Sequence, residues 1–326
     1  MKLSVLDLAP VPEEQSPREA LRNTTALAQR AEALGYVRYW LAEHHNMEGI
    51  ASSATAVVIG HVAGATERIR VGAGGIMLPN HAPLIIAEQF GTLETLYPGR
   101  IDLGLGRAPG TDPLTSQALR RTLNGTVDHF PEDVRELQLY FSDQRMKVQA
   151  NPGHGLNVPI WILGSSLYGA SLAAAFGLPY AFASPFAPAA IRQAIELYRN
   201  EFKPSAQLQE PYVMLGYNVC AAATEEEAIY LRSSSQQAFL NLRMGRPGKL
   251  PKPVEGLDER LSPQERAMLA QIGSCSSIGT LEQITESLAA FQAETQADEL
   301  MIVGQIYDTE ARIRSHELAM AAARAI

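Results

Sequence analysis

Cysteine is scarce in this chain of 326 residues, which contains only Cys220 and Cys275. The two stand far apart and outside any CxxC or Cys/His cluster, so we expect neither a disulfide framework nor a structural zinc site. A reducing, cytoplasmic location fits this sparing use of cysteine.

Long hydrophobic runs and clusters of positive charge are also missing. No stretch reaches the length of a membrane span, and the N-terminal segment is too short and too polar for a signal peptide. The formal net charge is -8, and lysine and arginine are not clustered, so nucleic acid is not an expected partner. With 46% hydrophobic and 19% charged residues, the composition is that of a globular protein with ample material for one core.

Apolar strand-like segments alternate with helical patterns along the chain. Helix starts show the capping-box pattern, in which Ser or Thr is followed three residues later by Glu or Gln, at 16–19, 224–227 and 280–283. The strand-like segments are 3–8, 37–41, 69–77, 101–105, 160–163, 180–183, 212–221 and 299–303.

About eight strands with intervening helices fit a (β/α)8 TIM barrel, and we predict one barrel domain over residues 1–326. A doubly wound open sheet explains the alternation almost as well, because the pattern does not show whether the sheet closes. Residues 244–263, rich in proline, glycine and lysine, are predicted to form a surface insertion.

The first cluster of reactive side chains is Glu43-His44-His45-Asn46, directly after the strand-like segment 37–41. In a barrel, the loops after the strand C-termini form the active-site face. An imidazole titrates near neutral pH, so we predict that one histidine is a general base. The other is expected to be structural, hydrogen-bonded to a backbone carbonyl. A metal site is disfavoured because neighbouring side chains diverge and no further ligand follows at helical spacing.

Three glycines, Gly72, Gly74 and Gly75, lie within the strand-like segment 69–77. Glycine weakens a strand, so they indicate a bulge, an unusual peptide geometry or the close approach of a flat ligand. A dinucleotide-binding fingerprint does not fit, because it needs its glycines in a turn that opens a helix.

Two further clusters favour an anion. Arg107 follows the segment 101–105 among small residues, and its guanidinium suits a phosphate, with a salt bridge to a carboxylate as the simpler alternative. At Gly164-Ser165-Ser166 a buried strand runs into an alanine-rich helix. Hydroxyls and free amides at such a junction bind phosphate, but plain N-capping by Ser165 or Ser166 explains the pattern equally well.

Together the clusters resemble the bacterial luciferase-like flavin monooxygenases over nearly the whole chain. The match at 164–166 is looser than at the other motifs, which are Leu41-Ala42-Glu43-His44-His45, the run Val71 to Pro83 with Ala87-Glu88-Gln89-Phe90, and the run Tyr97 to Arg107. The resemblance implies a barrel with flavin mononucleotide (FMN) lying across its C-terminal mouth.

The resemblance also implies a role for each matched residue. His44 acts in the chemistry of flavin and oxygen, and Gly74-Gly75 carry a non-proline cis peptide against the flavin ring. Arg107 holds the FMN phosphate together with Ser165 and Ser166. The other expected cofactor contacts are Met77, Gly106 and Gly164, and the expected apolar lining is Ile76, Met77, Leu78 and Leu105, although ordinary barrel packing explains each of these four equally simply.

The implied activity is monooxygenation of a small organic substrate, with reduced FMN as co-substrate for dioxygen. Luciferases proper carry a cysteine at the position of Gly106 and an acidic residue at that of Ser165, so light emission is not expected. No NAD(P)H fingerprint is present, so a separate flavin reductase is the expected source of reduced flavin. The resemblance further implies a homodimer.

Two alternatives stay open. A reductase of the same barrel class that transfers hydride with the deazaflavin F420 would have a similar phosphate site, and so would a flavin-binding barrel without turnover. The sequence does not identify the substrate, and aldehydes, ketones, sulfonates and aromatic amines all fit.

Overall fold

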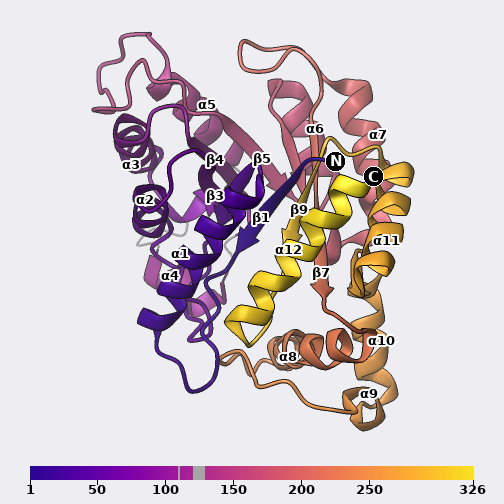
Figure 1. Cartoon of the computed structure of the whole chain (residues 1–326). Coiled ribbons are helices and arrows are strands. Elements are labelled where there is room, and N and C mark those ends of the chain that lie inside the picture. The colour runs from indigo at the N-terminus through magenta and orange to yellow at the C-terminus, as the bar shows by residue number, and fades with distance from the viewer. Residues whose placement is uncertain (109–110, 120–128) are drawn as a thin grey trace.

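The computed structural model describes residues 1–108, 111–119 and 129–326. Parallel strands form a barrel, and helices surround it (Figure 1). The barrel strands, in spatial order, are β1 (Leu3–Asp7), β2 (Arg38–Leu41), β3 (Arg70–Met77), β4 (Ile101–Gly106), β5 (Ile160–Gly164), β6 (Tyr180–Phe182), β7 (Val213–Ala221) and β9 (Glu299–Val303).

The barrel is closed by the pairing of β6 with β7, β7 with β9 and β9 with β1. The predicted (β/α)8 barrel is therefore confirmed, and the open-sheet alternative is wrong. One further strand, β8 (Ser276–Gly279), pairs with the second half of β7 beyond the end of β6. The pattern does not predict β8, because its four residues, Ser-Ser-Ile-Gly, contain a single large apolar side chain.

Helices follow the strands, and none in the described residues has both the length and the apolar character that a membrane crossing requires. Short 3-10 turns, η1 (Leu78–Asn80), η2 (Ser184–Phe186) and η3 (Pro188–Ala190), follow β3 and β6. The α-helices are α1 (Pro17–Leu34), α2 (Thr55–Gly64), α3 (Pro83–Leu96), α4 (Pro113–Leu119), α5 (Phe130–Phe141), α6 (Leu167–Phe176), α7 (Ile191–Glu201), α8 (Glu225–Arg243), α9 (Leu257–Arg260), α10 (Pro263–Gly273), α11 (Leu281–Thr295) and α12 (Thr309–Ala325).

The capping boxes predicted at the starts of α1 and α11 are both present. At the start of α8 the Thr224 hydroxyl accepts from the amide of Glu227, as a box requires. The Glu227 carboxylate, however, accepts from the amide of Ala223 instead of that of Thr224. The third box is therefore only half right, because the carboxylate reaches one residue too far back.

Residues 244–262, between α8 and α10, pack against the loop that follows β1. The amide of Leu250 donates to the carbonyl of Val11, and the amide of Glu13 donates to the carbonyl of Leu250, both at 2.9 Å. Lys252 adds an exposed ion pair with Glu14 at 2.8 Å. In Figure 1 the strands point toward the end where α8, α9 and α10 gather, so this segment borders the C-terminal mouth of the barrel.

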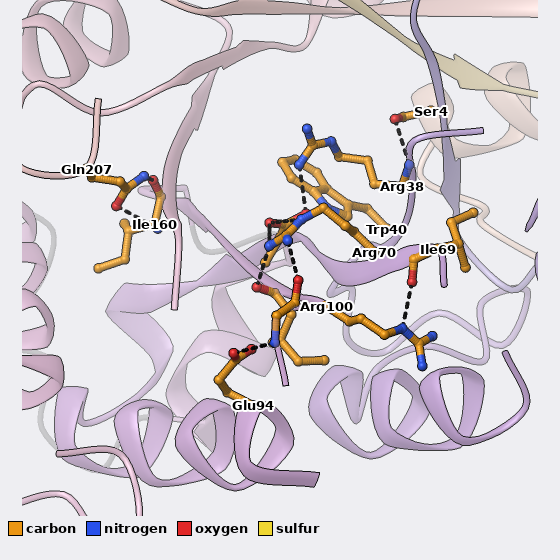
Figure 2. Close-up of polar contacts among 12 residues, drawn as sticks. Ser4, Arg38, Trp40, Ile69, Arg70, Glu94, Arg100, Ile160 and Gln207 are labelled. Carbon is orange, nitrogen blue, oxygen red and sulfur yellow. Dashed lines mark hydrogen bonds and ion pairs between the residues drawn. The ribbon is translucent and has the colours of Figure 1, made fainter. Parts of the chain in front are cut away.

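A buried ionic cluster fills the opposite, N-terminal end of the barrel interior. Arg38 on β2 donates to Asp102 on β4 at 2.8 Å and to both oxygens of Glu299 on β9 at 2.8 and 3.0 Å. Neither strand is a neighbour of β2, so the guanidinium crosses the interior. Arg70 and the Trp40 indole also donate to Asp102. Figure 2 shows the side chains of Arg38, Trp40 and Arg70 close to one another. Paired charges therefore close this end.

A second buried network ties α12 and α1 to the end of β1. Asp7 accepts from Arg312 at 2.8 Å and from Thr24 at 2.7 Å. Burial alone would raise the pKa of Asp7, but the charge of Arg312 and these hydrogen bonds hold it below its ordinary value. One turn beyond Arg312, His316 is buried with Nδ1 placed 2.9 Å from the Arg312 carbonyl oxygen.

We expect His316 to make the stability of the fold sensitive to acid. Burial, reinforced by the charge of Arg312, lowers the pKa of His316 to about 4 from 6.5. The unfolded chain takes up a proton here before the folded protein does, so stability falls as the pH drops from about 6.5 to about 4, by about 3 kcal/mol for this group. Urea unfolding at about pH 7 and about pH 4.5 should show a weaker pH dependence in His316→Gln. Equal dependence in both proteins would contradict this assignment.

Candidate active site at the barrel mouth

The clusters predicted to carry chemistry meet at the C-terminal ends of four adjacent strands. His44 follows β2, Met77 ends β3, Arg107 follows β4 and Ser165 follows β5. Met77 and Gly106 are register partners across β3 and β4. The structure therefore brings all four sequence clusters to one arc of the barrel rim, where TIM barrels carry their active sites.

His44 stands half-buried at this rim. Its Nδ1 is shielded from solvent and has no hydrogen-bond partner among the described residues. Burial lowers the pKa of His44 below 6.5, with the charge of Glu43 opposing the shift and that of His45 adding to it. At neutral pH the ring is therefore uncharged. An unpartnered buried nitrogen costs free energy, which is typical of a site where a ligand completes the hydrogen bonds.

Glu43 is a polar centre of the site, and no role was assigned to it from its place in the first sequence cluster. Its buried carboxylate contacts Nε2 of His45 at 2.8 Å and Nε2 of His81 at 2.9 Å. The expectation that the structural histidine binds a backbone carbonyl is therefore wrong for His45. His81 carried a signal in the sequence, since it follows the end of β3 at the same rim. Across the described residues, no group of three or more His, Cys, Asp or Glu is arranged to hold a metal ion.

The glycines of β3 are explained by close packing within the protein. A cis peptide bond joins Gly74 to Gly75, as the resemblance implied. A side chain on Gly74 would come within 2.7 Å of Leu6 Cδ1, and one on Gly75 within 2.8 Å of the Gly104 carbonyl oxygen. Both positions thus require glycine for contacts inside the barrel, independently of any ligand.

Gly106 and Met77 share one small volume at the rim. A Cβ on Gly106 would lie 2.9 Å from the Met77 sulfur. The thioether therefore occupies the space that a side chain at position 106 would need. The other residues of the expected apolar lining, Ile76, Leu78 and Leu105, are buried in the same core cluster as Phe90 of α3, which is ordinary barrel packing.

Arg107 is exposed and lies against α6. Its guanidinium carbon stands 4.1 Å from the ring centroid of Tyr168, which is in the first turn of α6. Among the residues that the structure describes, Arg107 makes no ion pair. A guanidinium stacked on an aromatic face loses little freedom when it binds an anion, so Tyr168 preorganises this charge beside the helix N-terminus.

The junction of β5 and α6 offers further donors next to Arg107. Gly164 ends β5, and Ser166 occupies the N-cap position, but its hydroxyl does not cap the helix. Plain N-capping is therefore wrong for Ser166. Ser165 and Ser166 are both exposed. The first turn of α6, two exposed hydroxyls and a guanidinium together suit a phosphate.

A closed parallel barrel with polar groups gathered at its C-terminal rim is the architecture of a TIM-barrel enzyme. The family model for luciferase-like monooxygenases matches residues 1–299. The chain belongs to the luciferase-like monooxygenase family.

Two curated relatives cover almost the whole chain. A luciferase-like monooxygenase of Escherichia coli (strain K12) is 54% identical over 319 residues, which are 97% of this chain and 95% of the relative. The N-acetyl-S-alkylcysteine monooxygenase of Bacillus subtilis (strain 168) is 30% identical over 334 residues, with 98% of this chain and 97% of the relative covered.

Solved structures agree with this assignment. Apo-MsnO8 has a TM-score of 0.88 and 32% identity, covering 99% of this chain and 98% of its own. At lower identity, two structures show the fold alone. The oxygenating constituent of 3,6-diketocamphane monooxygenase from Pseudomonas putida, in complex with FMN, has a TM-score of 0.72, 18% identity and coverage of 98% and 96%. An F420-dependent secondary alcohol dehydrogenase has a TM-score of 0.70, 15% identity and coverage of 98% of each chain.

Proposed function

We propose that this protein is an FMN-dependent monooxygenase that oxidises a small organic substrate with dioxygen, using reduced FMN as co-substrate. One observation carries the proposal. A buried imidazole nitrogen of His44 that has no partner among the described residues shares one rim with a guanidinium, Arg107, that lies beside the α6 N-terminus. Family membership supports it, as does the FMN bound by the 3,6-diketocamphane monooxygenase constituent, which has the same fold.

The residues at the rim fit FMN in charge and in hydrogen-bonding character. Arg107, Ser165 and Ser166 offer a cation and two hydroxyls to the phosphate. For the ring and its side chain, the proposed contacts are Gly74, Gly75, Met77, Gly106 and Gly164.

When bound, reduced FMN supplies two electrons, so that one oxygen atom of dioxygen enters the substrate and the other leaves as water. His44 is neutral at pH 7 and accepts or returns a proton at a ring nitrogen.

Oxygen uptake tests this function directly. The protein is supplied with FMN, NADH and a separate flavin reductase, which we propose as its partner. The substrate panel covers aldehydes, ketones, sulfonates, aromatic amines and the N-acetyl-S-alkylcysteines named for the Bacillus subtilis relative. We expect oxygenated product from at least one class. Tight flavin binding without substrate-dependent oxygen uptake would favour the non-catalytic barrel instead.

Hydride transfer with F420 is a second candidate, because an F420-dependent alcohol dehydrogenase has the same fold. Dissociation constants for FMN and F420, measured on the same preparation, separate the two candidates. A clear preference for F420 would overturn the FMN assignment.

We predict that Arg107→Ala weakens the binding of FMN by about 10- to 100-fold, since a hydrogen bond to a charged group contributes about 1.5–3 kcal/mol. Riboflavin has the same ring but no phosphate, so its affinity should stay unchanged. Fluorescence quenching of each flavin measures both constants. Arg145→Ala, which removes an exposed arginine elsewhere, is the matched control. An equal loss for riboflavin and FMN would remove Arg107 from the phosphate site.

We also propose that the protein is a homodimer formed through α2 and α3. These helices pack together and expose Val57, Ile85 and Leu96, with exposed fractions of 74%, 46% and 62%. The intervening exposed residues His61, Gln89 and Thr92 include no lysine, arginine, aspartate or glutamate. An exposed apolar face without such side chains is typical of an interface between copies.

The substitution Val57→Glu buries a charge in that interface and should convert the dimer to a monomer in sedimentation velocity. Val148→Glu, at another exposed valine, should leave the dimer intact. A dimer that survives Val57→Glu would place the interface elsewhere.

A further inference from the structure

The buried carboxylate of Glu43 connects two loops of the rim. Glu43 lies just after β2, and its exposed side-chain fraction is 1%. It accepts from the Met77 amide at 2.9 Å and from the Asn80 amide nitrogen at 3.4 Å. Its contacts with His45 and His81 complete a set of four donors, three of which come from the end of β3, the turn η1 and the residue directly after that turn. We call Glu43, His45 and His81 the Glu43 clamp.

The hydrogen bonds of the clamp show which ring nitrogen of His45 and of His81 faces Glu43. Burial would raise the pKa of Glu43, but the hydrogen bond and charge of His81, followed by the hydrogen bonds of His45 and the Met77 amide, hold it below its ordinary value. An ionised carboxylate only accepts hydrogen bonds. Nε2 therefore carries a hydrogen in both imidazoles and donates it to Glu43.

In the sequence His44 stands between two residues of this clamp, Glu43 and His45. A functional histidine is usually oriented by a hydrogen bond from its second ring nitrogen. The ring of His44, however, is not oriented by a hydrogen bond from Nδ1 to any described residue. The backbone on each side is held instead, since the Glu43 amide donates to the Gly75 carbonyl at 3.3 Å and Thr111 donates to the His45 carbonyl at 3.2 Å.

We propose that Glu43 and His81 are positioning residues for His44: the Glu43 clamp joins the ends of β2 and β3 and thereby sets where the His44 ring stands. The catalytic part of this inference rests on the proposed role of His44 in monooxygenation. His81 acts through Glu43 in this scheme, and it need not touch substrate or flavin.

Two variants of His81 show whether its hydrogen bond to Glu43 matters or only the volume of its side chain. His81→Ala removes the donor to Glu43, whereas His81→Gln keeps an N–H group that can reach the carboxylate. We expect the alanine variant to lose about 10- to 100-fold in kcat, with its affinity for oxidised FMN within about twofold of wild type. The glutamine variant should recover most of that rate. His154→Ala, in the loop before β5 at the opposite end of the barrel, is the control and should match wild type.

A second measurement needs neither flavin nor turnover. In protein with ¹⁵N-labelled histidine, the signals missing from His44→Ala identify the His44 ring, and their shifts report its tautomer and surroundings. We expect these shifts to change in His81→Ala and in Glu43→Gln and to return toward wild type in His81→Gln. Unaltered His44 signals in His81→Ala and Glu43→Gln, both still folded by circular dichroism, would overturn the proposal. If the wild type shows no oxygenation, the proposed function fails, while these spectra still decide the positioning role.

Discussion

Replacing His44 with alanine should lower the rate of product formation by about 10²- to 10⁴-fold, the usual contribution of a positioned general acid or base. Affinity for oxidised FMN should remain close to wild type, because the proposed phosphate contacts lie at Arg107 and α6. Reduced flavin that no longer leads to product should instead consume oxygen and release hydrogen peroxide. Product yield and peroxide, measured per NADH consumed, test this expectation.

The matched control for this experiment is His154→Ala. His154 lies in the loop before β5, at the end of the barrel opposite His44, so its loss should change neither product yield nor peroxide release. If His44→Ala also kept its full yield of product, His44 would have no part in the chemistry, and the proposed mechanism would fail at its central residue.

Replacing Arg38 with leucine should destabilise the fold by about 3–5 kcal/mol, because it leaves two buried carboxylates without their shared cation. Asp102 and Glu299 are both fully buried, and Arg38 donates three hydrogen bonds to them. Arg70 still neutralises Asp102 in the variant, so Glu299 carries most of the uncompensated charge. Urea unfolding followed by circular dichroism measures the loss.

Arg30→Leu provides the matched measurement for an exposed ion pair. Arg30 contacts Glu317 at 2.7 Å, a distance as short as those in the buried cluster, but 47% of its side chain is exposed. Solvent screening and side-chain entropy limit such a pair to about 0–1 kcal/mol. A similar, small loss in both variants would show that the cluster around Arg38 is not needed to stabilise the barrel.

The order of strands and helices was predictable because each element carries its own period of apolar residues. Closure of the barrel was not predictable, because the apolar pattern of a strand does not identify the strands with which it pairs. The Arg38 cluster illustrates this limit. Each charged residue is visible at the beginning of an apolar strand, but β2 meets β4 and β9 only across the interior, so their pairing depends on the closed barrel.

The site was predictable to the extent that the ends of neighbouring strands come together. His44, Arg107 and the junction at Ser165 could be placed at one rim from their positions after strands. The bond between Glu43 and His81 could not, because it depends on how far β3 extends beyond β2 and on the turn η1 that directs His81 back. The glycines of β3 gave a correct signal of unusual geometry, while the packing that requires them lies on the neighbouring strands.

The Arg38 cluster has a consequence for the order in which molecules bind. Because it fills one end of the barrel interior, a cofactor, dioxygen and a substrate would all enter and leave through the opposite opening. They would therefore bind in sequence, and a large molecule bound at that opening would keep a smaller one inside until it dissociated.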